Sequence, residues 1–233
     1  MNYKEHYRVD AETFDYWADY HFTPTEAIRD RMTLRLARIQ PGERVLDVGS
    51  GNGWFSLQAA SRDVEVTAMD LSEANLARIK QSDGRIQTWL ADALEPPAIE
   101  GKFDLVVALE VLEHLVDPGR ALAAWKNLLK PGGRLLLTVP YKEQIRYSLC
   151  IHCNQKTPHN AHLHSFDRES LAALVLQNGM KVLRAELFAH KLQSHLRLDR
   201  LTRQLPFPLW RGSDRICGIT GDKYNYLAIL CSL

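Results

Sequence analysis

The chain has 233 residues, of which 45% are hydrophobic and 24% charged, a composition typical of a globular protein with one sizeable α/β domain. Its 29 lysines and arginines nearly balance 28 aspartates and glutamates, so no strong net field predicts a nucleic-acid or membrane partner. No apolar run approaches the roughly 20 residues that cross a bilayer, and the first residues lack the apolar stretch of a secretory signal, so we expect a cytoplasmic location.

Residues 1–40 form an N-terminal unit whose composition differs from the rest. Aromatic residues are interleaved with acids there: Tyr3, Tyr7, Phe14, Tyr16, Trp17, Tyr20 and Phe22. Apolar residues at helical spacing then predict a helix over 25–38. Two interpretations are open, a helix packed on the edge of a sheet or a lid over a ligand site.

Residues 41–233 form the second unit, in which apolar runs alternate with helical periods. Buried strands are predicted at 44–48, 65–70, 86–90, 103–109 and 134–139, with helices at 54–61, 72–81 and 118–129. This βαβα alternation predicts an α/β fold with a parallel sheet covered on both faces.

The pattern changes after Pro140. Residues 141–166 are polar and rich in cysteine and histidine, which predicts a loop-like insertion. A helix is predicted from an Asp167 cap to Asn178, ended by Gly179. Strands are predicted at 181–188 and 224–230, with a helix at 194–205 and irregular chain over 206–221 between them.

The most informative motif is Val45-Leu-Asp-Val-Gly-Ser-Gly-Asn-Gly53, where a buried strand enters a glycine-rich turn before a helix. Gly49 and Gly51 allow positive φ and close approach of a ligand, and the helix N-terminus offers free N–H groups. Asp47 precedes the first glycine, where a carboxylate repels a diphosphate and suits a ligand with an ammonium and a sulfonium. The Gly-x-Gly-x-Gly spacing and the missing Gly-Lys-Ser/Thr also argue against dinucleotide and nucleotide sites.

Acids also end the next two predicted strands. Asp70 ends the second strand, where an acidic residue accepts hydrogen bonds from ribose hydroxyls. Asp92 follows the third strand, in position for an adenine amino group. One acid at a strand end commonly caps the next helix, but three at successive strands, together with the glycine turn, indicate a binding site.

At these residues the chain resembles the class I S-adenosylmethionine-dependent methyltransferases. The resemblance covers 41–140 and rests on the motifs 45–53, Met69-Asp-Leu-Ser72, Ala91-Asp-Ala93, 103–115 and Leu129-Lys-Pro-Gly-Gly133. It implies a doubly wound, Rossmann-like, seven-stranded sheet with the last strand antiparallel, and S-adenosyl-L-methionine as cofactor. By the same resemblance, the cofactor-binding residues are Asp47, Gly49 and Gly51 for the methionine portion, Asp70 and Leu71 for the ribose, Asp92 and Ala93 for the adenine, and Glu110 facing the amino acid or the acceptor.

A hydroxyl or ammonium acceptor also needs a base to remove its proton. His114 follows the fourth predicted strand, at the mouth of the expected site. His162 and His164, in the insertion, are the other candidates for a catalytic base. The alternative for His114 is a residue that caps or packs the turn after the strand.

Two metal sites are open as well. Glu110, Glu113 and His114 form a Glu-x-x-Glu-His pattern that resembles the metal site of small-RNA 2′-O-methyltransferases and of some ubiquinone-pathway O-methyltransferases, with His162 or His164 as the fourth ligand. The second is a closed zinc site in the insertion, with preferred ligands Cys150, Cys153, His159 and His162. His152 and His164 are alternative zinc ligands, and the insertion without metal would be a polar substrate loop.

We therefore expect an enzyme that transfers a methyl group from S-adenosyl-L-methionine to O or N of a small molecule. Its acceptor pocket is expected from the N-terminal unit, the insertion and residues 206–221. The alternatives are a macromolecule (RNA or protein) methyltransferase, a non-catalytic S-adenosylmethionine-binding protein, and a nicotinamide oxidoreductase, which Asp47 disfavours. The seven basic and three acidic residues of 184–215 are attributed to a solvated helix face rather than to an acidic acceptor.

Overall fold

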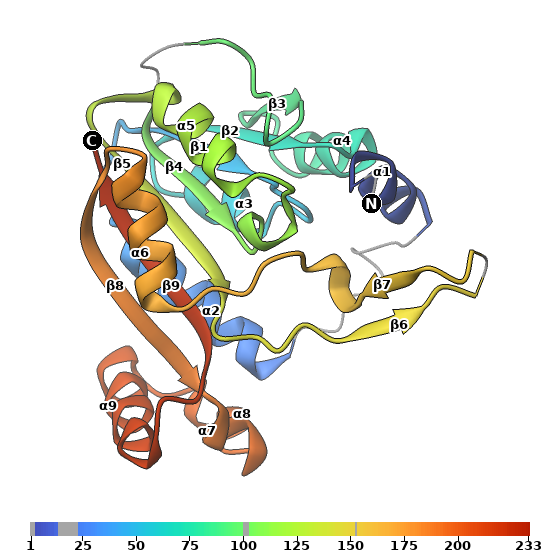
Figure 1. Cartoon of the computed structure of the whole chain (residues 1–233). Coiled ribbons are helices and arrows are strands. Elements are labelled where there is room, and N and C mark those ends of the chain that lie inside the picture. Colours follow the sequence, from blue (N-terminus) through green and yellow to red (C-terminus); the bar gives the residue numbers. More distant parts are fainter. Residues whose placement is uncertain (1–2, 14–22, 100–102, 152) are drawn as a thin grey trace.

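A computed structural model describes residues 3–13, 23–99, 103–151 and 153–233 (Figure 1). Five of the N-terminal aromatic residues, Phe14 to Phe22 in the sequence, and the alternative zinc ligand His152 lie outside this part. The strands of the main sheet are β1 (Arg44–Val48), β2 (Glu65–Asp70), β3 (Gln87–Leu90), β4 (Phe103–Leu109), β5 (Leu129–Pro140), β8 (Lys181–His190) and β9 (Tyr224–Ser232).

These seven strands form one sheet in the order β3-β2-β1-β4-β5-β9-β8. The first five are mutually parallel, whereas β9 runs antiparallel to both of its neighbours, β5 and β8. The predicted doubly wound, seven-stranded sheet with an antiparallel last strand is therefore confirmed. The strand order reverses between β1 and β4, and in such sheets ligands bind at the carboxyl ends of the strands beside that point.

Helices cover both faces of the sheet. On one face α2 (Pro24–Ala37), α3 (Trp54–Ala60) and α4 (Glu73–Ser82) bury apolar residues such as Met32, Phe55 and Ile79. On the other face α5 (Pro118–Leu128) and α6 (Arg168–Gln177) bury Trp125 and Leu171. Successive strand residues alternate between these two cores, as expected for a sheet buried on both sides.

Side-chain caps fix where two of these helices begin. Thr23 and Glu26 form a reciprocal capping box at the start of α2. Asp167 accepts the Ser170 N–H at the start of α6, as predicted. Gly179 follows α6 with a φ of +71°, so the predicted glycine stop is confirmed.

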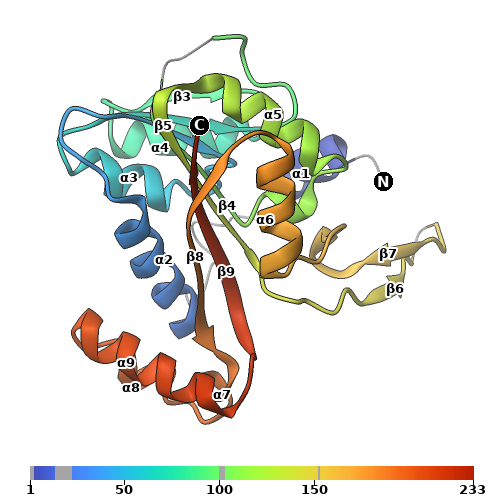
Figure 2. The same ribbon diagram turned by 60° about the vertical axis from the view of Figure 1, so that its left-hand side comes forward.

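The insertion at 141–166 is more regular than the predicted loop. β6 (Tyr147–Leu149) and β7 (Lys156–Pro158) pair as an antiparallel hairpin, and the short 3-10 helix η2 (His159–Ala161) follows it. Figures 1 and 2 show this hairpin projecting beside the main sheet. The insertion therefore has two parts. One is the turn that joins β6 to β7 at the outer end of the hairpin, and the other is the segment after β7 that leads back to the main sheet.

The region between β8 and β9 differs from the prediction. The helix expected at 194–205 is divided into α7 (Lys191–His195) and α8 (Asp199–Thr202), because Arg197 adopts a left-handed φ of +54° between them. The prediction of irregular chain at 206–221 is wrong, since α9 (Phe207–Cys217) and η3 (Gly218–Thr220) lie within this range. The prolines near position 207 start α9 rather than interrupt it, because the first helical turn needs no N–H from them.

The N-terminal unit contributes α1 (Tyr3–Thr13), which contacts α4 near the ends of the parallel strands. None of the helices in the described ranges is long and apolar enough to cross a bilayer.

Candidate functional site

The turn after β1 lies at the strand-order reversal, and its conformation requires glycine. Gly49 has a φ of +67°, and a Cβ at this position would lie 2.6 Å from Val111 Cγ2. β2 supports the turn from the side, because Asp70 Oδ2 accepts the Gly51 N–H at 2.8 Å. Glycine at position 49 therefore lets Val111 pack against the turn, and Gly49 and Gly51 line a cavity at the carboxyl ends of the strands.

Three buried or half-buried acids stand at these strand ends. Asp47 is 2% exposed and accepts a hydrogen bond of 2.7 Å from the Ser56 hydroxyl. Burial raises the pKa of Asp47 to about 7 and also raises the pKa of Asp70. Asp92 accepts the Leu94 N–H at 2.9 Å, so it holds the local turn in addition to facing the site. A cationic ligand here would favour the carboxylate forms and reverse these shifts.

One cavity of about 740 Å³ connects these groups, a volume typical of small-molecule sites. All eight predicted cofactor residues line it: Asp47, Gly49, Gly51, Asp70, Leu71, Asp92, Ala93 and Glu110. Further lining comes from α1, α2, the segment after β4 and the insertion, through Tyr7, Arg29, His114, Asn160 and His162. Segments far apart in the sequence therefore complete the cavity that the strand ends begin.

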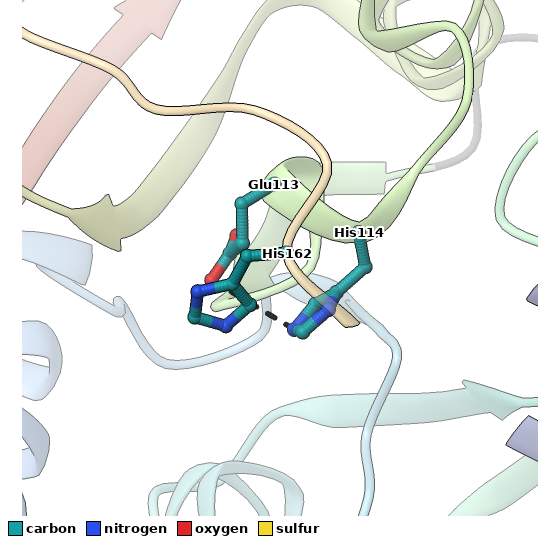
Figure 3. A group of neighbouring side chains, drawn as sticks. All are labelled: Glu113, His114 and His162. Atoms are coloured by element: carbon teal, nitrogen blue, oxygen red, sulfur yellow. Dashed lines mark ion pairs between the residues drawn. The ribbon is translucent and has the colours of Figure 1, made fainter. Parts of the chain in front are cut away.

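Glu113, His114 and His162 form a compact group beside this cavity (Figure 3). One ligand atom from each side chain lies within 4.8 Å of the others, and His114 Nε2 is 3.9 Å from Glu113 Oε1. Glu113 and His114 belong to the 3-10 helix η1 (Leu112–His114), which follows β4. The insertion docks on η1, because the Leu163 N–H donates to the Glu113 carbonyl at 2.8 Å, and this contact brings His162 into the group.

Burial dominates the electrostatics of the group. Glu113 is fully buried, and neither of its carboxylate oxygens has a hydrogen-bond partner among the described residues. Burial and the neighbouring Glu110 raise the pKa of Glu113 well above its usual value. Burial also lowers the pKa of His114 to about 4, which keeps the imidazole neutral at physiological pH. A cation held by this group would favour the Glu113 carboxylate and would meet His114 in its metal-binding form.

Three residues of the site were not predicted as site residues. The Tyr7 hydroxyl forms a 2.5 Å hydrogen bond with His114 Nδ1, and the two rings meet edge to face. Glu143 forms a hydrogen bond with His162 Nδ1. Arg29 lines the cavity from α2 and pairs with Asp30. The aromatic N-terminus was a signal for Tyr7, whereas no local pattern marks Glu143 or Arg29.

The structure separates the three histidine candidates for a base. His114 and His162 line the cavity, but His164 does not, because its Nε2 forms a 2.8 Å hydrogen bond with the Leu115 carbonyl. His164 is therefore a residue that fastens the insertion to the segment after β4.

The preferred zinc ligands are not assembled in the part of the chain that the structure describes. Among the described residues, the only group of three or more potential ligand side chains close enough to share a metal ion is Glu113, His114 and His162. Cys150, Cys153 and His159 are not part of that group. The hairpin explains this separation. The two cysteines occupy its outer turn, where the Cys150 N–H bonds to Gln155, while His159 and His162 follow its base.

Residues 206–221 do not line the cavity, contrary to the predicted acceptor pocket. α9 instead packs Trp210, which is 1% exposed, into the core on the α2 face of the sheet.

Comparisons with known proteins agree with this geometry. The sequence model of a family described as a methyltransferase domain matches residues 16–185. A ubiquinone biosynthesis O-methyltransferase of Xanthomonas axonopodis pv. citri is 32% identical over 208 residues, which cover 85% of this chain and 80% of that protein. A 27-O-demethylrifamycin SV methyltransferase of Amycolatopsis mediterranei is 39% identical over 132 residues, so the match spans about half of each protein, 52% of this chain and 48% of the relative.

Solved structures share the fold. An S-adenosylmethionine-dependent methyltransferase from Mesorhizobium loti has a TM-score of 0.64 at 18% identity and covers 90% of this chain and 98% of its own. The 1,6-didemethyltoxoflavin-N1-methyltransferase of Burkholderia thailandensis, with bound 1,6-didemethyltoxoflavin and S-adenosylhomocysteine, has a TM-score of 0.63 at 21% identity. The match covers 98% of this chain and 86% of that protein. At these identities the likeness concerns the fold alone.

Proposed function

The chain belongs to the class I S-adenosylmethionine-dependent methyltransferases, and we propose that it transfers the methyl group to a hydroxyl of a small molecule. The observation that carries this proposal is that the strand-end acids and the His114–His162 pair line one continuous cavity. The two relatives are named as an O-methyltransferase of ubiquinone biosynthesis and as a 27-O-demethylrifamycin SV methyltransferase, which favours a hydroxyl over an amine.

The donor would occupy the strand-end half of the cavity. Asp47 would face the positively charged amino-acid portion, next to the turn of Gly49 and Gly51, which also lines the cavity. Asp70 and Leu71 would hold the ribose, and Asp92 and Ala93 the adenine, as the family resemblance implies. A diphosphate is disfavoured here because its charge would add to that of the acids.

The acceptor would lie against His114 and His162. In the transfer the S–CH₃ bond breaks, its electron pair returns to sulfur, an O–CH₃ bond forms and the hydroxyl proton leaves. His114 Nε2 faces Glu113, and the carboxylate would stabilise an imidazolium that burial alone disfavours. We therefore assign proton uptake to the Glu113–His114 pair, with Tyr7 orienting the ring through Nδ1.

A divalent cation at the same group is the alternative to this base, because His114 Nδ1 is bonded to Tyr7 and a nitrogen that binds a cation cannot also take up a proton. Two imidazoles and a buried carboxylate with no other partner form a donor set that suits such a cation, so Glu113, His114 and His162 would hold it. Bound there, the cation would lower the pKa of an acceptor hydroxyl. Elemental analysis of protein purified without added metal, beside Glu113→Gln and Cys150→Ser/Cys153→Ser variants, separates this site from a zinc site in the hairpin. Loss of metal only in Glu113→Gln would support a cation bound by Glu113, His114 and His162. Loss of metal only in the cysteine variant would contradict this site and favour zinc in the hairpin.

We also assign α1 to the cover of the site, since Tyr7 reaches His114 from a separate helix. Closure by a terminal helix excludes water from the reacting groups. The N-terminal unit would then be a lid rather than a helix on the sheet edge.

Two experiments test the methyl transfer. Isothermal titration with S-adenosyl-L-methionine and its demethylated product, with NADH as control, should show binding of the first two only. A cell extract incubated with the enzyme and methyl-labelled donor should then yield a labelled small molecule whose fragmentation places the label on oxygen. Label on nitrogen would correct the acceptor atom, and label in the RNA or protein fraction would refute a small-molecule acceptor. Donor binding with no labelled product in any fraction would favour a non-catalytic protein.

A further inference from the structure

The segment between β8 and β9 exposes many large apolar side chains for its length. Within the described ranges, fifteen large hydrophobic residues are exposed, and seven of them fall in the short segment 196–219: Leu196, Leu198, Leu201, Leu205, Leu209, Ile216 and Ile219. Figures 1 and 2 place α7, α8 and α9 together at the end of the β8–β9 ribbon. Clustered exposed apolar residues mark interaction surfaces more often than scattered ones do.

α9 shows that this exposure is a regular face of a helix. Trp210 and Asp214, four residues apart, point inward and are buried. Leu209 and Ile216, seven residues apart and so on one side of the helix, are 61% and 67% exposed. The helix is therefore apolar on its outer side as well as on the side that packs on the protein.

The same segment carries an excess of positive charge. Residues 191–223 contain seven lysines and arginines and three aspartates, an excess of four positive charges in a chain whose net charge is +1. Two of the aspartates are buried and already bonded, Asp214 to Arg211 and Asp199 to Thr25. The exposed arginines have no carboxylate partner in the described structure: Arg197, Arg200, Arg203 and Arg215.

The segment is firmly attached to the fold. Arg31 of α2 donates to the carbonyls of Arg203 and Leu205, at 3.0 and 2.6 Å, and stacks over the Phe207 ring. α2 also supplies Arg29 to the cavity. The exposed apolar and basic groups thus belong to an ordered surface that is one helix away from the site.

We propose that this surface, residues 191–223, docks the protein on an anionic phospholipid membrane. Leucine and isoleucine would enter the headgroup boundary while the unpaired arginines meet the acidic headgroups. A single-stranded nucleic acid fits less well, because its bases stack on exposed aromatic rings and the exposed apolar residues here are aliphatic. A second copy of the chain also fits less well, because a two-fold contact would bring two copies of the same positively charged surface together.

Vesicle flotation of the full chain tests the proposal, with phosphatidylglycerol-containing vesicles compared with pure phosphatidylcholine. We expect flotation with the anionic vesicles only, weakened by high salt. Arg200→Gln with Arg203→Gln should lower the partition constant roughly thirtyfold, because each basic residue near an anionic surface contributes about 1 kcal/mol to binding. Leu209→Ser with Ile216→Ser should lower it by about a hundredfold or more.

Matched controls carry the same substitutions elsewhere on the surface. Arg38→Gln with Arg62→Gln, and Leu176→Ser with Leu183→Ser, change exposed residues outside the segment and should float like the unaltered protein. Unchanged donor affinity in every variant shows that the cavity is intact and separates this test from that of the methyl transfer. Absence of flotation with anionic vesicles, equal losses in the control variants, or binding of an oligonucleotide or a second copy in place of vesicles would each overturn the proposal.

Discussion

Replacing Asp70 with asparagine should weaken donor binding by at least about a hundredfold. The carboxylate ends β2 and lines the cavity, where two ribose hydroxyls would donate to it. A hydrogen bond to a charged group contributes about 1.5–3 kcal/mol, so the loss of charge at two such bonds weakens binding by about 3 kcal/mol or more. Since about 1.4 kcal/mol corresponds to tenfold, the dissociation constant rises by two orders of magnitude.

The same carboxylate also supports the protein itself, so the assay needs a folding control. Asp70 accepts the N–H groups of Gly51 and Ser72, both at 2.8 Å, and asparagine keeps only one acceptor oxygen. Titration calorimetry should therefore be paired with thermal unfolding. Glu65→Gln is a matched control, because Glu65 begins the same strand and its ion pair with Arg44 is exposed. A folded Asp70→Asn protein that binds the donor within threefold of the unaltered chain would refute the ribose assignment.

Three further predictions concern the cavity and the core. Tyr7→Phe removes the hydroxyl that bonds to His114, so it should lower kcat/KM by about two- to tenfold without changing donor affinity. Tyr147→Phe, on the exposed hairpin, is the control and should change neither quantity. Equal effects of the two substitutions would refute the role of α1. Donor affinity should rise as the pH increases through about 7, because Asp47 must be ionised to attract the ammonium and burial raises its pKa to that value; calorimetry across this range that gives constant affinity would contradict the assignment. Trp210→Ala should lower the free energy of unfolding, measured in urea, by about 3–5 kcal/mol, because this side chain is 1% exposed in the core. Donor affinity should stay unchanged, and a large loss of it in the folded variant would contradict the position of Trp210 outside the cavity.

The donor half of the site could be predicted from the sequence because its determinants are local. A glycine turn and an acid at a strand end are visible in a few consecutive residues, and the parallel sheet then brings the ends of β1, β2 and β3 to one edge. For this reason all eight predicted cofactor residues line one cavity. The strands and most helices were predictable for the same reason, since apolar spacing reports which face of each element is buried.

The overall charge of the chain does not report how charge is distributed over its surface. The near-neutral composition predicted no membrane partner, and the proposed docking surface rests instead on burial, since two of the three aspartates in residues 191–223 are buried while most of the basic side chains are exposed. α9 was missed because its prolines resemble loop residues when the packing of Trp210 is not known. Burial, which composition does not report, decided both points.

The acceptor half of the site depended on contacts between distant segments. Tyr7 and His114 are 107 residues apart, and no spacing rule relates them. His162 and His164 were both candidates for the base in sequence, but the hydrogen bonds of residues 163 and 164 to the Glu113 carbonyl turn His162 inward, and the Leu115 carbonyl holds His164 away. Local sequence determined which residues end the strands, whereas the tertiary structure decided which side chains meet, because that depends on how the insertion and α1 pack on the sheet.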